Sequence, residues 1–278
     1  MSGFRERFEA ISRTNGSLVC IGLDPDPNLM AVPDVAAFNR AIVDATSDLV
    51  CAFKPNFPFY EALGLPGLKA LEQTVDHIRS AAPHVIVLAD GKRGDIGSTN
   101  EKYAQALFDT WGFDAATVNA YAGLESLDPF LEYEDKGIII WCRSSNPGAG
   151  DIQDMRINDG AEELPMYEWL AAQASERNSR GNVGLVVGAT YPEQLSAVRG
   201  RAPELPILIP GIGAQGGALK ESLLAGMGSK APNVLISSSR GITYASRNEG
   251  DFAEAARAAA SALRDQINAV LTAEGRPW

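Results

Sequence analysis

The stretch "VIVLADGKRGDIGSTN", residues 85–100, joins an unbroken apolar run to a dense set of charges. The apolar half is continuous rather than alternating, which is typical of a strand buried on both faces of a parallel sheet. The charged half places Asp90, Lys92, Arg93 and Asp95 within six positions. This stretch therefore predicts a buried parallel strand that ends in a charged loop.

Other short apolar runs have the same character, and we expect them to form strands at 17–23, 49–54, 115–120, 137–142, 183–188, 206–211 and 233–239. Segments with helical periodicity lie between the runs, at 34–48, 67–81, 100–112, 166–178, 191–202 and 251–273. This alternation, in a chain near the roughly 250-residue norm, predicts an α/β fold with a single (β/α)8 TIM barrel domain over residues 1–278. A doubly wound open sheet is the main alternative.

The composition excludes several classes of protein. The chain has 278 residues, a hydrophobic fraction of 45% and a formal net charge of −11. The acidic balance disfavours nucleic-acid binding, which needs a basic surface. No apolar run approaches the roughly 18 residues of a membrane span, and the N-terminus lacks the apolar core of a secretory signal. We therefore expect a cytoplasmic protein that binds neither nucleic acid nor membranes.

The cysteines and histidines do not form a reactive or metal-binding pattern. Cys20, Cys51 and Cys142 all lie inside apolar stretches, and their odd number favours reduced core thiols over disulfides or nucleophiles. His77 and His84 flank a helical stretch without ligand spacing, so we expect them at the surface or its boundary. A zinc site or a histidine-based triad is therefore not expected.

Polar and charged side chains gather where the predicted strands end. In a barrel of this kind, the active site lies at the carboxyl ends of the strands. The residues found there are Asp24, Lys54, Asp90, Lys92, Asn119, Ser144, Ser145 and Arg240. The opposite strand ends show no comparable convergence. This asymmetry predicts an enzyme.

Two loops after the last two predicted strands suggest a phosphate site. They are "PGIGAQGG" at 210–217 and "SSSRGI" at 237–242. Glycines let backbone N–H groups approach an anion closely, and this position is the usual phosphate site of the barrel fold. Arg240 could hold the phosphate bidentately, and the Gln215 amide could donate a further hydrogen bond. A plain tight turn is the alternative interpretation of either loop alone.

Six segments together resemble a known family. "GLDPD", "AFKPN", "ADGKRGDIGST", "SSNPGA", "PGIGAQGG" and "SSSRG" occur in an order similar to that of orotidine 5′-monophosphate decarboxylases, from Gly22 to Gly241. The segment "CRSSNPGAGDIQDMR" resembles the longer bacterial branch of this family. The resemblance implies a homodimeric barrel that needs no metal or cofactor. It implies that the chain converts orotidine 5′-monophosphate into UMP and carbon dioxide.

The resemblance also implies roles for individual residues. Lys54, Asp90 and Lys92 match three members of a charged catalytic tetrad, and Asp95 matches the fourth, which the partner subunit donates. The remaining residues are expected to bind the substrate. Asp24 matches the ribose-binding aspartate, Ile96 and Thr99 match residues at the interface, and Ser145 matches the serine at the pyrimidine edge. Gln215 and Arg240 match phosphate ligands, and Pro210 and Ser239 are further expected substrate-binding residues. The stretch 144–165 is expected to be an active-site loop insertion. The resemblance does not indicate which of its residues close over the ligand.

The chemistry of the residues agrees with these roles. Asp90 and Lys92 are two positions apart and should share one face at a strand end, where Lys54 of the neighbouring strand can reach them. Gly94 is expected to allow a sharp turn that sends Asp95 toward an interface. Lys92 would stabilise an anion at C6 of the pyrimidine and then protonate it.

Three other interpretations of the charged cluster remain at this point. It could be an ion-pair network that only braces the barrel mouth. The same Asp-x-Lys-x-x-Asp pattern occurs in sugar-phosphate decarboxylases or aldolases of this scaffold, which use magnesium. A non-catalytic protein that binds nucleotide phosphates is the third interpretation, and it would bind UMP without turnover.

Overall fold

The computed structural model describes residues 3–158, 160, 162–212, 219–228 and 233–278. Parallel strands close into a barrel in the order β1-β10-β9-β8-β5-β4-β3-β2. Their bounds are Val19–Leu23 (β1), Ala52–Pro55 (β2), Ile86–Arg93 (β3), Ala115–Val118 (β4), Gly137–Arg143 (β5), Val183–Val187 (β8), Ile207–Pro210 (β9) and Val234–Ser238 (β10). Because β1 pairs with both β2 and β10, the sheet has no open edge. The prediction of a TIM barrel is confirmed, and the open-sheet alternative is wrong.

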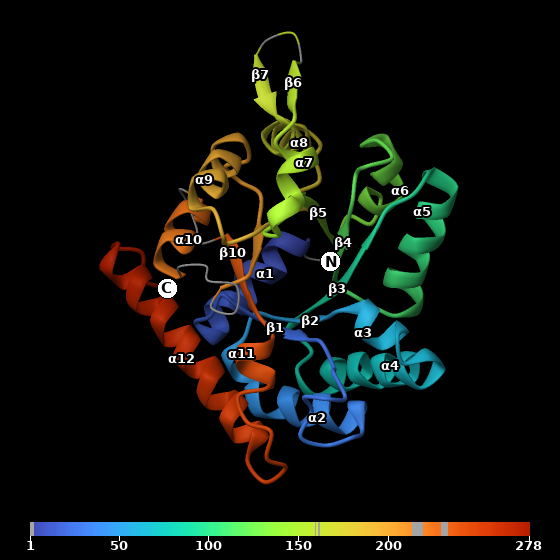
Figure 1. The fold of residues 1–278 in the computed structure, drawn as a ribbon, viewed down its shortest axis with the longest axis vertical. Helices are drawn as coiled ribbons and strands as arrows, with labels where there is room; N and C mark the ends of the chain where they lie inside the picture. The colour runs from blue at the N-terminus through green and yellow to red at the C-terminus, as the bar shows by residue number, and fades with distance from the viewer. Residues whose placement is uncertain (1–2, 159, 161, 213–218, 229–232) are drawn as a thin grey trace.

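Helices surround the strands on the outside of the barrel (Figure 1). The longer ones are Phe4–Asn15 (α1), Val35–Thr46 (α2), Gly64–Ala81 (α4), Gly97–Ala104 (α5), Met166–Glu176 (α8), Pro192–Arg201 (α9), Leu219–Gly226 (α10) and Phe252–Ala273 (α12). Shorter helices are Phe57–Glu61 (α3), Asp128–Leu131 (α6), Gly150–Gln153 (α7) and Arg240–Thr243 (α11). Single 3-10 turns span Ser47–Leu49, Glu125–Leu127 and Pro147–Ala149.

Two differences from the expected helices have local causes. The helix expected at 100–112 begins at Gly97, because Asn100 of its first turn bonds to the backbone of Asp95, and it continues as a π-helix over Gln105–Thr110. The sequence analysis missed α10, which is only eight residues long and directly follows the glycine-rich loop. A helix that short carries little periodic signal.

The core consists of the aliphatic strand residues and the apolar faces of the helices. Cys20, Cys51 and Cys142 are buried and free, and burial raises the pKa of the Cys20 and Cys142 thiols to about 12. His77 is half-buried beside Asp44, and His84 is exposed. These observations agree with core thiols and boundary histidines.

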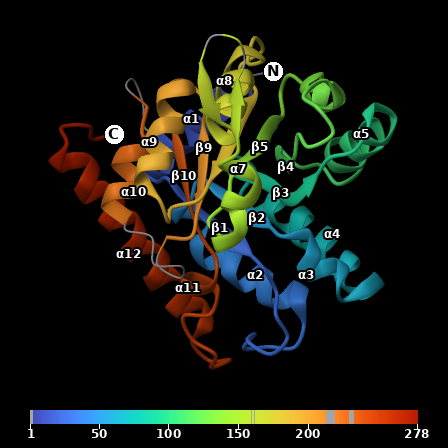
Figure 2. The same ribbon diagram turned by 45° about the horizontal axis from the view of Figure 1, so that its top comes forward.

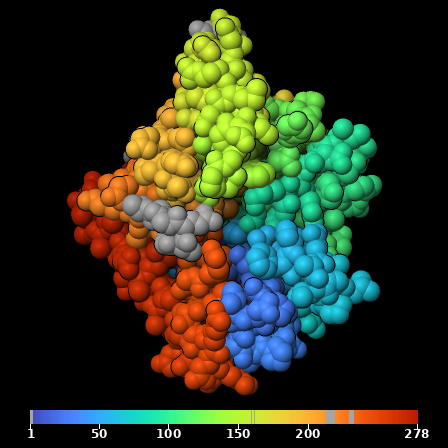
Figure 3. All heavy atoms as spheres, viewed as in Figure 1, coloured from blue at the N-terminus to red at the C-terminus, as the bar shows by residue number. Residues whose placement is uncertain are grey.

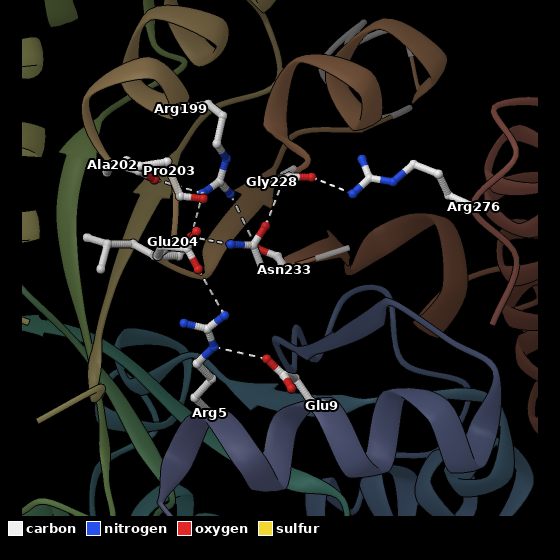
Figure 4. A network of polar contacts seen from close by, with 10 residues as sticks. Arg5, Glu9, Arg199, Ala202, Pro203, Glu204, Gly228, Asn233 and Arg276 are labelled. Carbon is white, nitrogen blue, oxygen red and sulfur yellow. Dashed lines mark hydrogen bonds and ion pairs between the residues drawn. The ribbon is translucent and has the colours of Figure 1, made fainter. Parts of the chain in front are cut away.

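The amino ends of β9 and β10 are held together by a buried arginine (Figure 4). Arg199, which is 8% exposed, donates hydrogen bonds to the backbone carbonyls of Gly226, Ala202 and Leu205 at 2.7–2.8 Å. Burial lowers the pKa of Arg199 to about 10. The bonds tie the C-terminus of α10 to the loop before β9. Arg199 therefore has a structural role at this end of the barrel, because its donors are used on backbone carbonyls.

A two-stranded hairpin projects from the barrel within the expected insertion at 144–165. Its antiparallel strands are Arg156–Asn158 (β6) and Glu163–Pro165 (β7). The hairpin protrudes at the top of the ribbon and space-filling views (Figures 1, 2 and 3). The sequence analysis expected an insertion here but not its strands. Among the described helices, none combines the length and the apolar character that crossing a bilayer requires.

Candidate functional site

A cavity of about 300 Å³ lies at the carboxyl ends of the barrel strands. Its wall comes from β1, β2, β3, β5, β8, β9 and β10 and from the residues that follow them. The predicted residues in this wall are Asp24, Lys54, Asp90, Lys92, Ser144, Ser145, Pro210, Ser239 and Arg240. Side chains that the chain order keeps far apart therefore meet at one face, as the sequence predicts.

Asp90 is held between two lysines on the cavity wall. Its Oδ2 lies 2.7 Å from Nζ of Lys54, and its Oδ1 lies 2.7 Å from Nζ of Lys92. The Lys54 side chain is 6% exposed, whereas that of Lys92 is 35% exposed. Lys54 thus anchors the carboxylate from the interior, and Lys92 is the more accessible of the two lysines.

The charged groups of this cluster stabilise one another's ionised forms despite their burial. Burial disfavours the ionised form of Asp90, but Lys54 and Lys92 outweigh it and hold the pKa of this carboxyl well below its ordinary value. Burial also disfavours the charge of Lys54, but Asp90 and Asp24 outweigh it and raise the pKa of that ammonium above its ordinary value. Asp90 is therefore a carboxylate and Lys54 an ammonium at neutral pH.

The backbone at Lys92 is not a regular strand. Lys92 has a φ of +43°, in the left-handed region, and the β3–β4 register shifts between Ala89 and Arg93. The expectation that Gly94 allows a sharp turn stays a prediction, but the left-handed backbone lies at Lys92 and not at Gly94. β3 ends at Arg93, directly before Gly94. Gly94 is also needed for packing, because a Cβ there would lie 2.4 Å from the carbonyl oxygen of Asn119.

Asp24 and Ser239 lie side by side across Gly22. A Cβ at Gly22 would lie 1.9 Å from Oγ of Ser239 and 3.3 Å from Oδ1 of Asp24, so only glycine fits between them. Asp24 Oδ1 is buried, and no protein donor among the described residues bonds to it. A buried carboxylate oxygen without a donor is costly, so this atom is suited to accept a hydrogen bond from a ligand.

The wall from β5 holds the two predicted serines and an arginine that the sequence analysis did not single out. Arg143 is 4% exposed and donates to Gln194 of α9 at 2.8 Å and to Gln153 of α7 at 2.9 Å. Gln153 also accepts from the backbone N–H of Ser144 at 2.9 Å. Arg143 therefore joins the barrel to the start of the insertion. Its only sequence signal is a charge directly before the serine pair at a predicted strand end.

Ser145 packs closely against the neighbouring strand end. A Cβ at Gly188, which follows β8, would lie 2.7 Å from the Cβ of Ser145 and 2.9 Å from its backbone nitrogen. Gly188 also donates its N–H to the carbonyl of Arg143 at 2.9 Å. The position of Ser145 at the cavity thus depends on the absence of a side chain at Gly188.

The expected phosphate end is described in part. Pro210, Ser239 and Arg240 lie in the cavity wall, and Arg240 is exposed at the first position of α11. Gln215 lies outside the described residues. Pro210, the last residue of β9, pairs with Ser237 of β10, so the two expected phosphate loops begin side by side.

Asp95, Ile96 and Thr99 do not line this cavity. Asp95 and Ile96 are exposed, and 64% of Ile96 is accessible. The buried Asn100 fixes their backbone, because its amide donates to the Asp95 carbonyl at 2.8 Å and its oxygen accepts the Asp95 N–H at 3.0 Å. The chain thus presents Asp95 in an exposed position outside its own cavity wall, on a segment that Asn100 holds by hydrogen bonds.

Comparison with known proteins places the chain in a family. Residues 17–258 match the family described as orotidine 5′-phosphate decarboxylase / HUMPS. A curated orotidine 5′-phosphate decarboxylase of Thermomicrobium roseum is 50% identical over 274 residues, with 96% of this chain and 95% of that protein covered.

Solved structures agree with this result. Leishmania donovani OMP decarboxylase is 36% identical, with a TM-score of 0.84 and with 97% of this chain and 98% of that one covered. Leishmania donovani UMP synthase is 38% identical with a TM-score of 0.87, and this chain spans 57% of its length. The chain therefore belongs to the orotidine 5′-phosphate decarboxylase family.

Proposed function

We propose that this protein decarboxylates orotidine 5′-monophosphate to UMP, the last step of de novo UMP synthesis, with Lys54, Asp90, Lys92 and Asp95 as its catalytic residues. The family membership and the 50% identity to a decarboxylase support the reaction. The observation that supports the site is the Asp90 carboxylate held at 2.7 Å by two ammonium groups on the wall of the cavity. A carboxylate and two ammonium groups arranged in this way can bind and orient a substrate that itself carries a carboxylate.

The bound nucleotide would span the cavity from the strand end of β3 to that of β10. Asp24 Oδ1 is suited to accept a hydrogen bond from a ribose hydroxyl. Ser145 would bond to the pyrimidine edge. Arg240 would hold the phosphate together with Gln215, since a guanidinium binds phosphate bidentately. Ser239 and Pro210 would contact the substrate beside them. This orientation brings C6 of the pyrimidine and its carboxylate against Asp90 and Lys92.

The reaction breaks the bond between C6 and the carboxylate carbon, and the electron pair of that bond remains on C6 as carbon dioxide leaves. The Lys92 ammonium stabilises this developing anion and then transfers a proton to C6, which completes UMP. Water returns a proton to Lys92. Asp90 keeps Lys92 oriented toward the reacting carbon and faces the substrate carboxylate. No step in this scheme uses a metal or a cofactor.

We also propose that the active form is a homodimer in which each chain lends Asp95, with Ile96 and Thr99, to the other chain's cavity. Support comes from the exposed position of Asp95 on a segment that Asn100 holds in place. The neighbouring Tyr121 is 84% exposed and Ile96 64%, so two large apolar side chains face outward on this side of the barrel. Burial of such side chains favours association.

The insertion at 144–165 is proposed to close over the bound nucleotide. Arg143, Gln153 and Ser144 already connect its first part to the cavity wall. Phosphate and ribose contacts lie far from C6, and their binding energy can drive such closure. The free buried thiols support a cytoplasmic location.

The test is a spectrophotometric assay of purified protein with orotidine 5′-monophosphate, with and without EDTA. We expect conversion to UMP at the same rate in both samples. Loss of activity with EDTA would favour a magnesium-dependent sugar-phosphate enzyme. Binding of UMP without turnover would favour a non-catalytic nucleotide-binding protein and would contradict the proposal.

A further inference from the structure

Lys92 carries the reacting ammonium on a backbone that needs external support. Among the described residues other than glycine, only Lys92 has a positive φ. Side chains with a Cβ disfavour this region, so the surrounding structure must hold the residue there. The regular ladder does not hold it, since the register of β3 on β4 breaks between Ala89 and Arg93.

Two side chains hold the Lys92 backbone by its N–H and its carbonyl. They belong to Thr117 of β4 and to Asn119, the residue directly after β4. Oγ1 of Thr117 accepts the N–H of Lys92 at 3.0 Å and that of Gly91 at 3.1 Å. Nδ2 of Asn119 donates to the carbonyl of Lys92 at 2.8 Å, and its backbone N–H donates to the carbonyl of Arg93 at 2.9 Å. Thr117 is 1% exposed, so water cannot replace its contacts.

The geometry around the Thr117 hydroxyl fixes where its hydrogen points. A hydroxyl has one hydrogen to donate and two lone pairs to accept with. Both lone pairs are used by the N–H groups of Gly91 and Lys92. The hydrogen is therefore directed to an acceptor, and the nearer one is Oδ1 of Asp90 at 3.0 Å, compared with the Ala89 carbonyl at 3.4 Å. This Oδ1 is the same oxygen that binds Nζ of Lys92.

We infer that Thr117 and Asn119 are positioning residues for the decarboxylation. Thr117 connects the backbone of Lys92 to the carboxylate that orients its ammonium, so one hydroxyl fixes both ends of the lysine. Asn119 fixes the carbonyl side. Without them Lys92 would relax from its left-handed conformation, and its ammonium would move away from the reacting carbon. A small displacement of this kind is costly for catalysis. The inference rests on the proposed function.

The experiment compares Thr117→Val, which has nearly the same shape without the hydroxyl, with Thr117→Ser, which keeps it. We expect Thr117→Val to lower kcat for orotidine 5′-monophosphate about 10- to 100-fold, the range for a lost hydrogen bond to a charged group. The Kd for UMP, measured by calorimetry, should change by less than about threefold, because Thr117 does not line the cavity. Thr117→Ser should keep kcat within about threefold of wild type.

A matched control separates positioning from stability. Thr46 is another buried threonine, and its Oγ1 donates to the carbonyl of Ile42 within α2. Thr46→Val should lower the melting temperature without changing kcat below it. If Thr117→Val proves insoluble, Asn119→Ala provides the same test, and its kcat should fall while its Kd for UMP stays near that of wild type.

Several results would overturn the inference. Wild-type kcat in Thr117→Val would do so, and so would an equal loss in Thr117→Ser, because the hydroxyl would then not matter. A rise in the Kd for UMP as large as the fall in kcat would show a role in binding instead. Failure of the proposed function is distinguishable, because the wild-type protein itself would then not convert orotidine 5′-monophosphate.

Discussion

Removal of the Lys92 ammonium should abolish decarboxylation while leaving the site assembled. In Lys92→Ala, Asp90 keeps its 2.7 Å contact with the buried Lys54, so the carboxylate is still paired. The Lys92 side chain is 35% exposed, so its removal leaves no closed cavity in the core. We therefore expect a folded protein that still binds UMP.

The magnitude follows from the two roles of Lys92. A half-exposed ammonium about 4 Å from a developing anion contributes about 4 kcal/mol at an effective dielectric constant of about 20. That energy corresponds to about 10³-fold in rate. Loss of the proton donor adds roughly 10²- to 10⁴-fold. The variant should therefore lose at least about 10⁵-fold in kcat.

The assay is the absorbance change of orotidine 5′-monophosphate, with UMP binding measured in parallel by calorimetry. Lys69→Ala is the control, because the Lys69 side chain is 65% exposed on the outer face of α4, where it pairs with Glu72 three residues later. It should retain wild-type activity. If Lys92→Ala keeps more than a few per cent of wild-type kcat while remaining folded, Lys92 is not the proton donor and the mechanism fails.

Two further predictions concern opposite ends of the barrel. Arg240→Ala should lower kcat/KM for orotidine 5′-monophosphate, because about 2–4 kcal/mol of phosphate binding is lost. The same change should hardly affect a substrate without the phosphate. An equal loss on both substrates in steady-state kinetics would refute the assignment. Arg199→Met should lower the free energy of unfolding in urea by about 3 kcal/mol or more, because several buried carbonyls lose their donor, while KM stays near that of wild type. Unchanged stability, or a selective loss of substrate affinity, would contradict a purely structural role for Arg199.

Much of the fold and of the charged cluster could be predicted from local sequence. Continuous aliphatic runs such as 85–90 and 137–142 are typical of strands buried on both faces of a parallel sheet, and the strands lie close to the positions that these runs predict. Since β2 and β3 are neighbours, the meeting of Lys54 with Asp90 followed from strand order.

The rest depends on contacts between distant segments. The left-handed backbone of Lys92 is imposed by Thr117 and Asn119, which lie about 25 residues later in the chain, and no local pattern marks it. The role of Arg143 depends likewise on glutamines of two other helices. The sequence marks Gly94 as a position of conformational freedom, but its close packing against Asn119, where a Cβ would lie 2.4 Å from the carbonyl oxygen, depends on a segment that the local sequence does not show.

The central claim is that Lys54, Asp90 and Lys92 of one chain act with Asp95 of the other. The most direct test mixes two inactive variants, Lys92→Ala and Asp95→Asn, under conditions in which subunits exchange. In a two-fold dimer, each hybrid has one site with both changes and one with neither. Random pairing makes about half of the dimers hybrid, so about a quarter of wild-type decarboxylase activity should return. No recovery, with exchange confirmed by mass spectrometry, would contradict the shared site.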